Sequence, residues 1–280
     1  MFQPVIPLSG NSGWNFLQST YDRQLEAYSN SPQIRQDREY MTEKLSQPIT
    51  LDDFMNDKRL LRVTMTAFGL GGEEWKGGFI RKVLTEVSDP ESTFLPRLNN
   101  AKYSEFANTL LPLLGEIQLD EATVTDLGDR FEAASFEEAV GEVDDDMRLS
   151  LNFKSEISAI AGSGSSEDTI AYKILGDIPI RTLLETATNL PSGISQLPVE
   201  KQAEIFKDKI RSAFGISNLS QLADADVTQK VIQRFHAMQS ISNGVSSTAP
   251  GAAALTLLQA GTSQSGLGSQ ASQNLFLSLL

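Results

Sequence analysis

The side chains that most often supply nucleophilic or general-base catalysis are scarce in this sequence, which has one histidine and no cysteine. A Ser-His-Asp triad would therefore have to use His236 as its base. His236 follows Phe235 in a helical pattern of apolar residues, and no nucleophile elbow lies near it. We expect no triad and no enzymatic activity.

Two glycine-rich stretches share only their composition with phosphate-binding loops. Residues 69–72 (GLGG) and 162–164 (GSG) follow no predicted strand, and neither fits GxxxxGK[ST] or GxGxxG. Both motifs work by converging backbone N–H groups on a phosphate at the start of a helix. We interpret the two stretches as connectors and expect no nucleotide or other cofactor.

Three adjacent carboxylates, Asp144, Asp145 and Asp146, are the best candidates for metal ligands, because hard cations prefer carboxylate oxygens. Neighbouring residues on a helix point in different directions, however, so these three side chains cannot converge on one ion. The spacing of an EF-hand loop is also absent. We expect no metal site.

The acidic residues are concentrated in residues 116–146, where twelve Asp and Glu side chains are opposed by Arg130 alone. Twelve minus one leaves this segment with −11 of the formal net charge of −13. The main group of basic side chains lies elsewhere and consists of Lys58, Arg59, Arg62, Arg81 and Lys82. We predict that the acidic segment packs near this basic cluster; a solvated acidic face is the alternative.

The overall composition excludes several classes of protein. A chain of 280 residues, 40% of them hydrophobic, is long enough for one large or two ordinary domains with a sizeable core. A net charge of −13 argues against a general nucleic-acid surface, because phosphate binding needs a basic face. No cationic stretch precedes an apolar one near Met1, so no cleaved secretory signal is expected. No apolar run of about 18 residues predicts a membrane span.

Residues 50–84 are predicted to form two helices joined at a glycine corner, and we expect the rest of the fold to be organised around this hairpin. Thr50 precedes an acidic residue three positions on, as in an N-cap. Gly69 ends the first helix, where a residue without Cβ can adopt the left-handed conformation. The candidate core residues recur at helical spacing and are Leu61, Met65, Phe68, Trp75, Phe79 and Ile80.

Helical periodicity continues on both sides of the hairpin, and no convincing strand is found. Further helices are predicted over residues 15–28, 32–45 and 104–114, within 116–146, and in runs that begin near Asp177, Pro198 and Asp226. The expected fold class is therefore all-α, with amphipathic helices in an orthogonal or bundle-like packing. We predict an N-terminal helical domain over residues 1–148, a C-terminal helical subdomain over 149–238 and a low-complexity tail over 239–280.

The predicted tail carries no charged residue and is rich in Ser, Gln, Gly and Ala. It nevertheless contains apolar residues at helical spacing, and the candidate partner-docking residues are Leu255, Leu258, Leu275, Phe276 and Leu279. Short helices of this length are marginal alone. We expect the tail to fold against a partner or a neighbouring copy, with docking on its own core as the alternative.

Eight stretches along the chain carry a resemblance to a known family: residues 13–18 (GWNFLQ), 57–61 (DKRLL), 67–70 (AFGL), 79–84 (FIRKVL), 136–142 (FEEAVGE), 146–149 (DMRL), 206–209 (FKDK) and 232–235 (IQRF). In content and order they resemble a family of unknown function found in the flagellar gene clusters of alphaproteobacteria. Residues 98–103 (LNNAKY) depart from the family's Leu-Ala-Asp ahead of Arg-Tyr, and the tail is poorly covered.

The resemblance implies a helical architecture and a role in flagellum assembly or structure, and it carries over no catalytic residue. We therefore expect a non-enzymatic flagellar protein, either a structural component or an assembly factor, that contacts other flagellar proteins. The alternative is a cytoplasmic helical adaptor or chaperone-like binder of a flagellar export substrate. The two hypotheses place the protein in the bacterial flagellum or in the cytoplasm.

Overall fold

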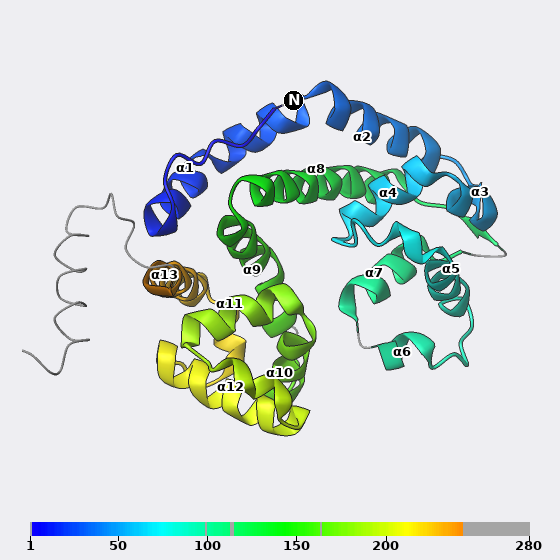
Figure 1. The fold of residues 1–280 in the computed structure, drawn as a ribbon. Coiled ribbons are helices and arrows are strands. Elements are labelled where there is room, and N and C mark those ends of the chain that lie inside the picture. The colour runs from blue at the N-terminus through cyan, green and yellow to red at the C-terminus, as the bar shows by residue number, and fades with distance from the viewer. Residues whose placement is uncertain (1, 99, 113–114, 163, 243–280) are drawn as a thin grey trace, which may run out of the picture.

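The computed structural model describes residues 2–98, 100–112, 115–162 and 164–242, and helices make up most of this part of the chain (Figure 1). In chain order the α-helices are α1 (Gly10–Ser29), α2 (Pro32–Leu45), α3 (Leu51–Asn56), α4 (Lys58–Ala67), α5 (Gly77–Glu86), α6 (Phe94–Leu98), α7 (Ala101–Leu110), α8 (Glu121–Val143), α9 (Asp145–Ala161), α10 (Glu167–Gly176), α11 (Ile178–Thr188), α12 (Val199–Phe214) and α13 (Ala225–Ser242). Short 3₁₀ helices are η1 (Glu74–Lys76), η2 (Ser192–Gln196) and η3 (Leu219–Ala223). The predicted all-α fold class is confirmed.

The described residues contain one small sheet, formed by two strands of two residues each. Strand β1 (Ile49–Thr50) pairs antiparallel with β2 (Glu116–Ile117), and Ile49 lies opposite Ile117. Sequence periodicity did not predict these strands, because two residues are too few to show an alternating pattern. The pair fixes the start of α3 beside the segment that leads into α8.

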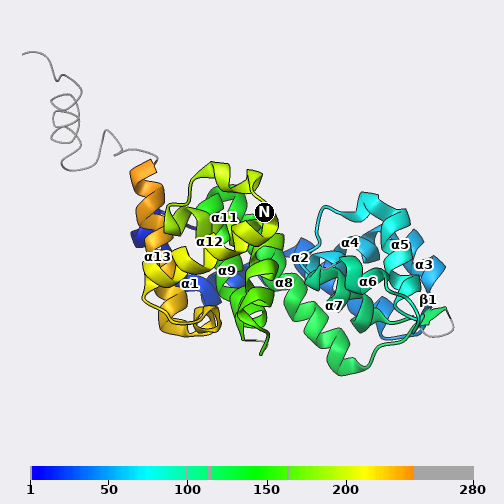
Figure 2. The same cartoon turned by 90° about the horizontal axis from the view of Figure 1, so that it is seen from below.

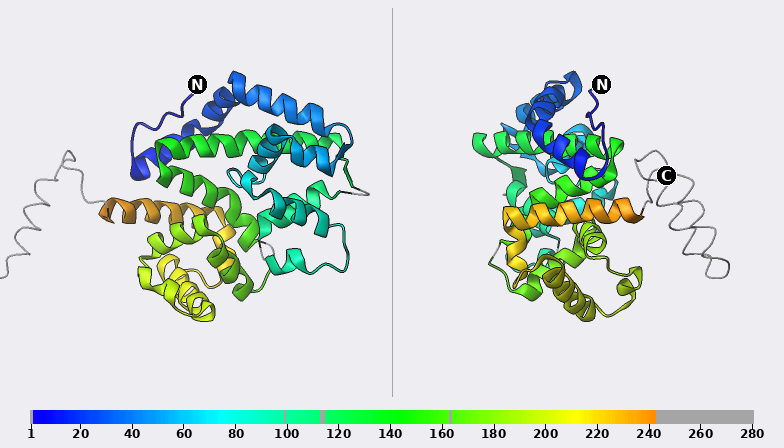
Figure 3. Two further views of the ribbon diagram at one scale, coloured as in Figure 1. Left: turned by 45° about the vertical axis from the view of Figure 1, so that its right-hand side comes forward. Right: turned by 90° about the vertical axis from the view of Figure 1, so that its left-hand side faces the viewer.

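Two separate hydrophobic cores divide the described residues into two lobes (Figure 2). The first lobe consists of α2 to α7, and the second consists of α1 and α9 to α13. Helix α8 belongs to both, because its Leu127 and Phe131 enter the first core whereas its Phe136 and Val140 enter the second. Figure 3 shows α8 running beneath α1 and α2, and both of these helices pack on it.

The two cores do not follow the division predicted at residue 148, which falls inside α9. Trp14 and Leu17 of α1 are buried in the second core together with Phe235 of α13, so the first helix packs with the C-terminal part of the chain. Helical periodicity shows which face of a helix is apolar but not which distant helix covers that face. The boundary between the lobes was therefore beyond what sequence spacing could show.

The predicted hairpin is present, but its first helix is divided. Thr50 caps α3, as predicted, by accepting a hydrogen bond from the backbone N–H of Asp53 at 3.0 Å. Asp57 then adopts an extended conformation and starts α4 by accepting from the N–H of Leu60 at 2.9 Å. Gly69 has a φ of +64°, which confirms the left-handed corner.

Most of the residues that were predicted to form the core of the hairpin are buried or half-buried. Leu61, Met65, Phe68 and Ile80 are buried. Phe79 is half-buried and packs edge-on against the ring of Tyr103, with centroids 5.0 Å apart. These five positions lie on α4, at the end of α4 and on α5, where the predicted helical spacing holds.

The prediction that Trp75 is a core residue is wrong, because its side chain is 80% exposed. Trp75 lies on η1, and α5 begins only at Gly77. A 3₁₀ turn has three residues per turn rather than 3.6, so it rotates its side chains out of phase with the α-helix that follows. Spacing that assumed one continuous helix therefore assigned Trp75 to the wrong side.

Helix α8 packs against α4, so the acidic segment does lie beside the helix that carries most of the predicted basic cluster. The ion pairs of that cluster are nevertheless made with other acids. Arg59 and Arg62 both bind Asp37 of α2 at 2.7 Å, and Arg81 binds Asp52. The predicted proximity is present, whereas the charge neutralisation comes mainly from α2 and α3.

Two acidic residues of α8 form ion pairs with Arg38 of α2. Its guanidinium binds Asp129 at 2.6 Å and Glu132 at 2.7 Å. Gly128 allows this contact, because a Cβ built on it would lie 2.8 Å from Nε of Arg38. The segment thus fixes the α2–α8 packing through two carboxylates and leaves many others facing solvent.

Candidate functional site: a charged cleft between the two lobes

A cleft of about 360 Å³ lies between the two lobes and is lined by residues of both. The corner after α4 and the start of α7 form one wall, with Gly69, Glu73 and Lys102. Helix α9 and the turn from α10 to α11 form the other wall, with Glu156 and Ile178. Clefts where two domains or lobes meet are common binding sites, so this cleft is the candidate functional site.

An ion pair crosses the cleft. Nζ of Lys102 on α7 lies 3.9 Å from a carboxylate oxygen of Glu156 on α9, which is beyond hydrogen-bond length. The left-handed Gly69 makes room for Lys102, because a Cβ there would lie 3.1 Å from the same Nζ. A long, partly exposed pair of this kind contributes only about 0–1 kcal/mol and can separate at little cost.

The carboxylates around this lysine are incompletely neutralised. Burial, followed by the charge of Glu156, raises the pKa of Glu137 to about 7, and Lys102 only partly opposes the rise. Burial also raises the pKa of Glu156 and of the neighbouring Glu138. Of these three carboxylates only Glu156 lines the cleft, and a Lys or Arg side chain that approached it would favour its charged form.

Glu137→Gln is expected to raise the free energy of unfolding at pH 8 by about 1–3 kcal/mol. The pKa of Glu137 is higher in the folded protein than in the unfolded chain, so its destabilising effect is absent below about pH 4.5 and complete above about pH 7. Urea unfolding at pH 8 and pH 4 measures the effect, with Glu142→Gln on an exposed position of the same helix as the control. A gain of equal size at both pH values would contradict the assignment.

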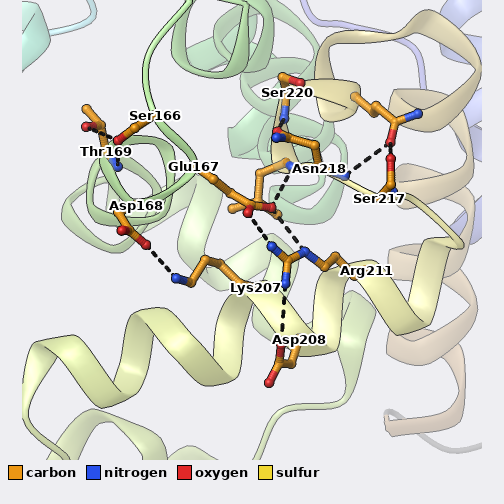
Figure 4. A network of polar contacts seen from close by, with 12 residues as sticks. Ser166, Glu167, Asp168, Thr169, Lys207, Asp208, Arg211, Ser217, Asn218 and Ser220 are labelled. Carbon is orange, nitrogen blue, oxygen red and sulfur yellow. Dashed lines mark hydrogen bonds and ion pairs between the residues drawn. The ribbon is translucent and has the colours of Figure 1, made fainter.

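The second wall of the cleft is held in place by a polar network between α10, α12 and η3 (Figure 4). The guanidinium of Arg211 on α12 binds both carboxylate oxygens of Glu167 at the start of α10. One of these oxygens also accepts a hydrogen bond from the N–H of Leu219 at 3.1 Å. Bidentate arginine–carboxylate pairs fix geometry as well as energy. The network thus sets the position of the helix that leads to Ile178.

Ile178 is the one large hydrophobic side chain among the cleft-lining residues that is exposed, at 76%. It is the first residue of α11, which begins where the sequence predicted, and Asp177 caps this helix by accepting from the N–H of Ile180 at 3.1 Å. Sequence analysis recognised the helix start but gave Ile178 no role. The sequence signal that could have been used is an apolar residue, Ile178, between the cap Asp177 and Pro179. That its side chain points outward depends on tertiary packing, which this signal does not show.

The other residues considered for chemistry lie outside the cleft. His236 is buried between α13, α9 and α1, with Nε2 3.0 Å from Oγ of Ser150. The three adjacent aspartates diverge as predicted: Asp144 caps α9, Asp145 binds Arg148 and Asp146 accepts from Gln239. In the part of the chain that the structure describes, no group of three potential metal ligands occurs.

The predicted docking residues of the tail, Leu255, Leu258, Leu275, Phe276 and Leu279, lie outside the described residues. The same holds for most of the predicted tail over residues 239–280. Within the described ranges, no helix is both long enough and apolar enough to cross a bilayer.

Two helical lobes with separate cores, a shared helix and a charged cleft define the chain as a two-lobed, all-α protein. The chain belongs to the DUF1217 family of proteins of unknown function, whose sequence profile matches residues 67–228. The matched range includes both walls of the cleft and the network that supports α10.

The fold is similar to the X-ray crystal structure of a protein from Agrobacterium tumefaciens that was a structural genomics target. The two chains are 25% identical, with a TM-score of 0.65, and the match covers 86% of this chain and 99% of the other. The comparison with curated proteins found no match.

Proposed function

We propose that this protein is a non-enzymatic part of the bacterial flagellum, a structural component or assembly factor, and that it binds another flagellar protein through the cleft between its lobes. The link to the flagellum rests on the resemblance of the eight sequence stretches. The observation that favours binding is the cleft itself, which combines exposed Ile178 with Glu156, whose ion pair with Lys102 is long and weak.

A protein segment fits this cleft better than a small polar metabolite does. The exposed Ile178 offers an apolar anchor, and a basic side chain that approached Glu156 on the cleft wall would also relieve its repulsion with Glu137. Interfaces commonly combine an apolar centre with a polar rim in this way. The weak Lys102–Glu156 pair can be replaced by a partner's lysine or arginine without loss of a strong internal contact.

Localisation of the protein in the cell distinguishes a flagellar component or assembly factor from a cytoplasmic adaptor. A structural component or assembly factor should be found in purified basal bodies or in the culture supernatant of the flagellated host. A cytoplasmic adaptor or chaperone-like binder should instead be absent from both and co-purify with an export substrate. Deletion of the gene that leaves swimming and flagellar filaments unchanged would contradict the proposed function in both forms.

Ile178→Asp is expected to abolish swimming while leaving the thermal unfolding of the purified protein unchanged. An acidic residue is favourable in the first turn of a helix, so the substitution should not disturb α11. The matched control is Ile241→Asp, because Ile241 is 73% exposed on α13 and does not line the cleft. Normal swimming with Ile178→Asp at normal protein levels would show that the cleft is not the contact surface.

A further inference from the structure

Trp75 is exposed on a turn that the rest of the molecule holds in a defined position. Its indole is 80% exposed, whereas the other tryptophan, Trp14, is fully buried. A tryptophan has the largest apolar side chain, and leaving it in water forgoes a large gain from burial. Tryptophan is also strongly enriched among the residues that dominate binding energy at protein interfaces.

The turn that carries Trp75 is fixed by hydrogen bonds on both sides of it. The carboxylate of Glu73 accepts from the hydroxyl of Tyr103 at 2.5 Å and from Nζ of Lys76 at 2.7 Å. The carboxylate of Glu74 accepts from the N–H of Gly72 at 3.1 Å. Because Tyr103 is buried in the first core, these contacts tie η1 to the body of the lobe.

The indole itself is held against a charged neighbour. Nζ of Lys76 lies 5.5 Å from the centroid of the Trp75 ring, within the range of a cation–π contact. The side chain is thus presented outward on a turn that is already ordered. Such preorganisation lowers the entropic cost of binding.

The surroundings of Trp75 on the chain are rich in carboxylates. Glu73 is paired with Lys76, but Glu74 also precedes Trp75, and Glu138 of α8 approaches the same loop, since a Cβ on Gly71 would lie 2.5 Å from its Oε1. An anionic lipid surface would be repelled by these groups and by the net charge of −13. A second copy would bring identical carboxylates into contact, so a basic partner is the complementary one.

We propose that Trp75 inserts its indole into an apolar pocket of a partner protein whose rim carries Lys or Arg side chains. The inference rests on the proposed function only in that the protein acts through protein contacts. Trp75 itself does not line the cleft, although Glu73 of the same turn does, so the contacts of Trp75 and Ile178 are tested by separate substitutions.

The partner is identified by placing the photoreactive amino acid p-benzoylphenylalanine at position 75 of the full-length protein in its flagellated host. The same amino acid at position 241 is the control, because Ile241 has a similar exposure on α13. We expect a protein that cross-links from position 75 and not from position 241. Cross-linking to a second copy, to lipid or to no protein at all would overturn the proposal.

The partner identified by cross-linking is then purified, and its binding to this protein tests the role of the indole. In a Trp14→Phe background, Trp75 is the sole tryptophan of this chain, and its emission should shift to shorter wavelength when a tryptophan-free variant of the partner is added. Trp75→Ala should raise the Kd about 30-fold or more, as expected for a dominant interface residue. Glu74→Lys should weaken binding most strongly at low salt.

The two contacts are distinguished by comparing variants. Ile241→Ala should change the Kd less than twofold. An unchanged Kd with Trp75→Ala would overturn the inference about Trp75, and the effect of Ile178→Asp on swimming would still decide the proposed function of the cleft.

Discussion

Phe68→Ala is expected to lower the free energy of unfolding by about 3–5 kcal/mol. Phe68 follows α4 directly, is 5% exposed and packs edge-on against Phe106, with centroids 5.4 Å apart. Removal of the ring would leave a cavity in the first core and an unpaired face on Phe106. If the proposed function holds, we expect swimming to decline only because less folded protein is present.

Urea unfolding of the full-length variants measures this loss, and two neighbouring aromatic residues provide graded controls. Phe79→Ala should cost less, about 1–3 kcal/mol, because Phe79 is only half-buried. Trp75→Ala should change stability by no more than about 0.5 kcal/mol, because its ring is in water. Equal losses for Phe68→Ala and Trp75→Ala would mean that the exposed turn has been assigned incorrectly.

Acidification is expected to destabilise the protein through His236. Burial lowers the pKa of His236 to about 4, and the charge of Asp144 opposes this only in part. The folded pKa lies below the unfolded value near 6.5, so the unfolded chain binds the extra proton between these pH values. This group does not destabilise the protein above about pH 6.5, and its destabilising effect grows as the pH falls toward 4. The gap corresponds to about 3 kcal/mol.

The measurement compares the wild type with His236→Gln, which is uncharged at every pH. The stability difference between the two proteins should shift by about 3 kcal/mol in favour of the variant when the pH falls from 7 to 4. The comparison is needed because Glu137 titrates with the opposite sign over the same range. Parallel stability curves for the two proteins would contradict a buried, neutral His236.

The local features of the fold could be predicted from sequence because each depends on a few adjacent residues. The cap at Thr50, the helix start at Asp177 and the left-handed glycine after α4, Gly69, are all present as expected. The division at Asp57 was missed, because the apolar residues keep their spacing across it. The same assumption of one unbroken helix misplaced Trp75.

The candidate site could not be predicted in the same way. Its walls come from segments that are far apart in the sequence, and no local pattern indicates that Lys102 faces Glu156. The charge count did identify the acidic segment, but not that Glu137 would be buried beside a second carboxylate. Sequence analysis located the acidic residues, and only the packing of α8 and α9 shows that Glu137 is buried near Glu156.

The contact between α1 and α13 has a consequence for how the protein is made. The indole N–H of Trp14 donates to Oε1 of Gln229 at 3.3 Å, across 215 positions of the chain. At about 5–20 residues per second, a ribosome needs about 10–40 s to synthesise that distance. Throughout this interval the apolar face of α1 lacks the helix that finally covers Trp14. Among the described elements, the first helix to be synthesised is thus enclosed by the last, and the nascent chain must remain soluble until then.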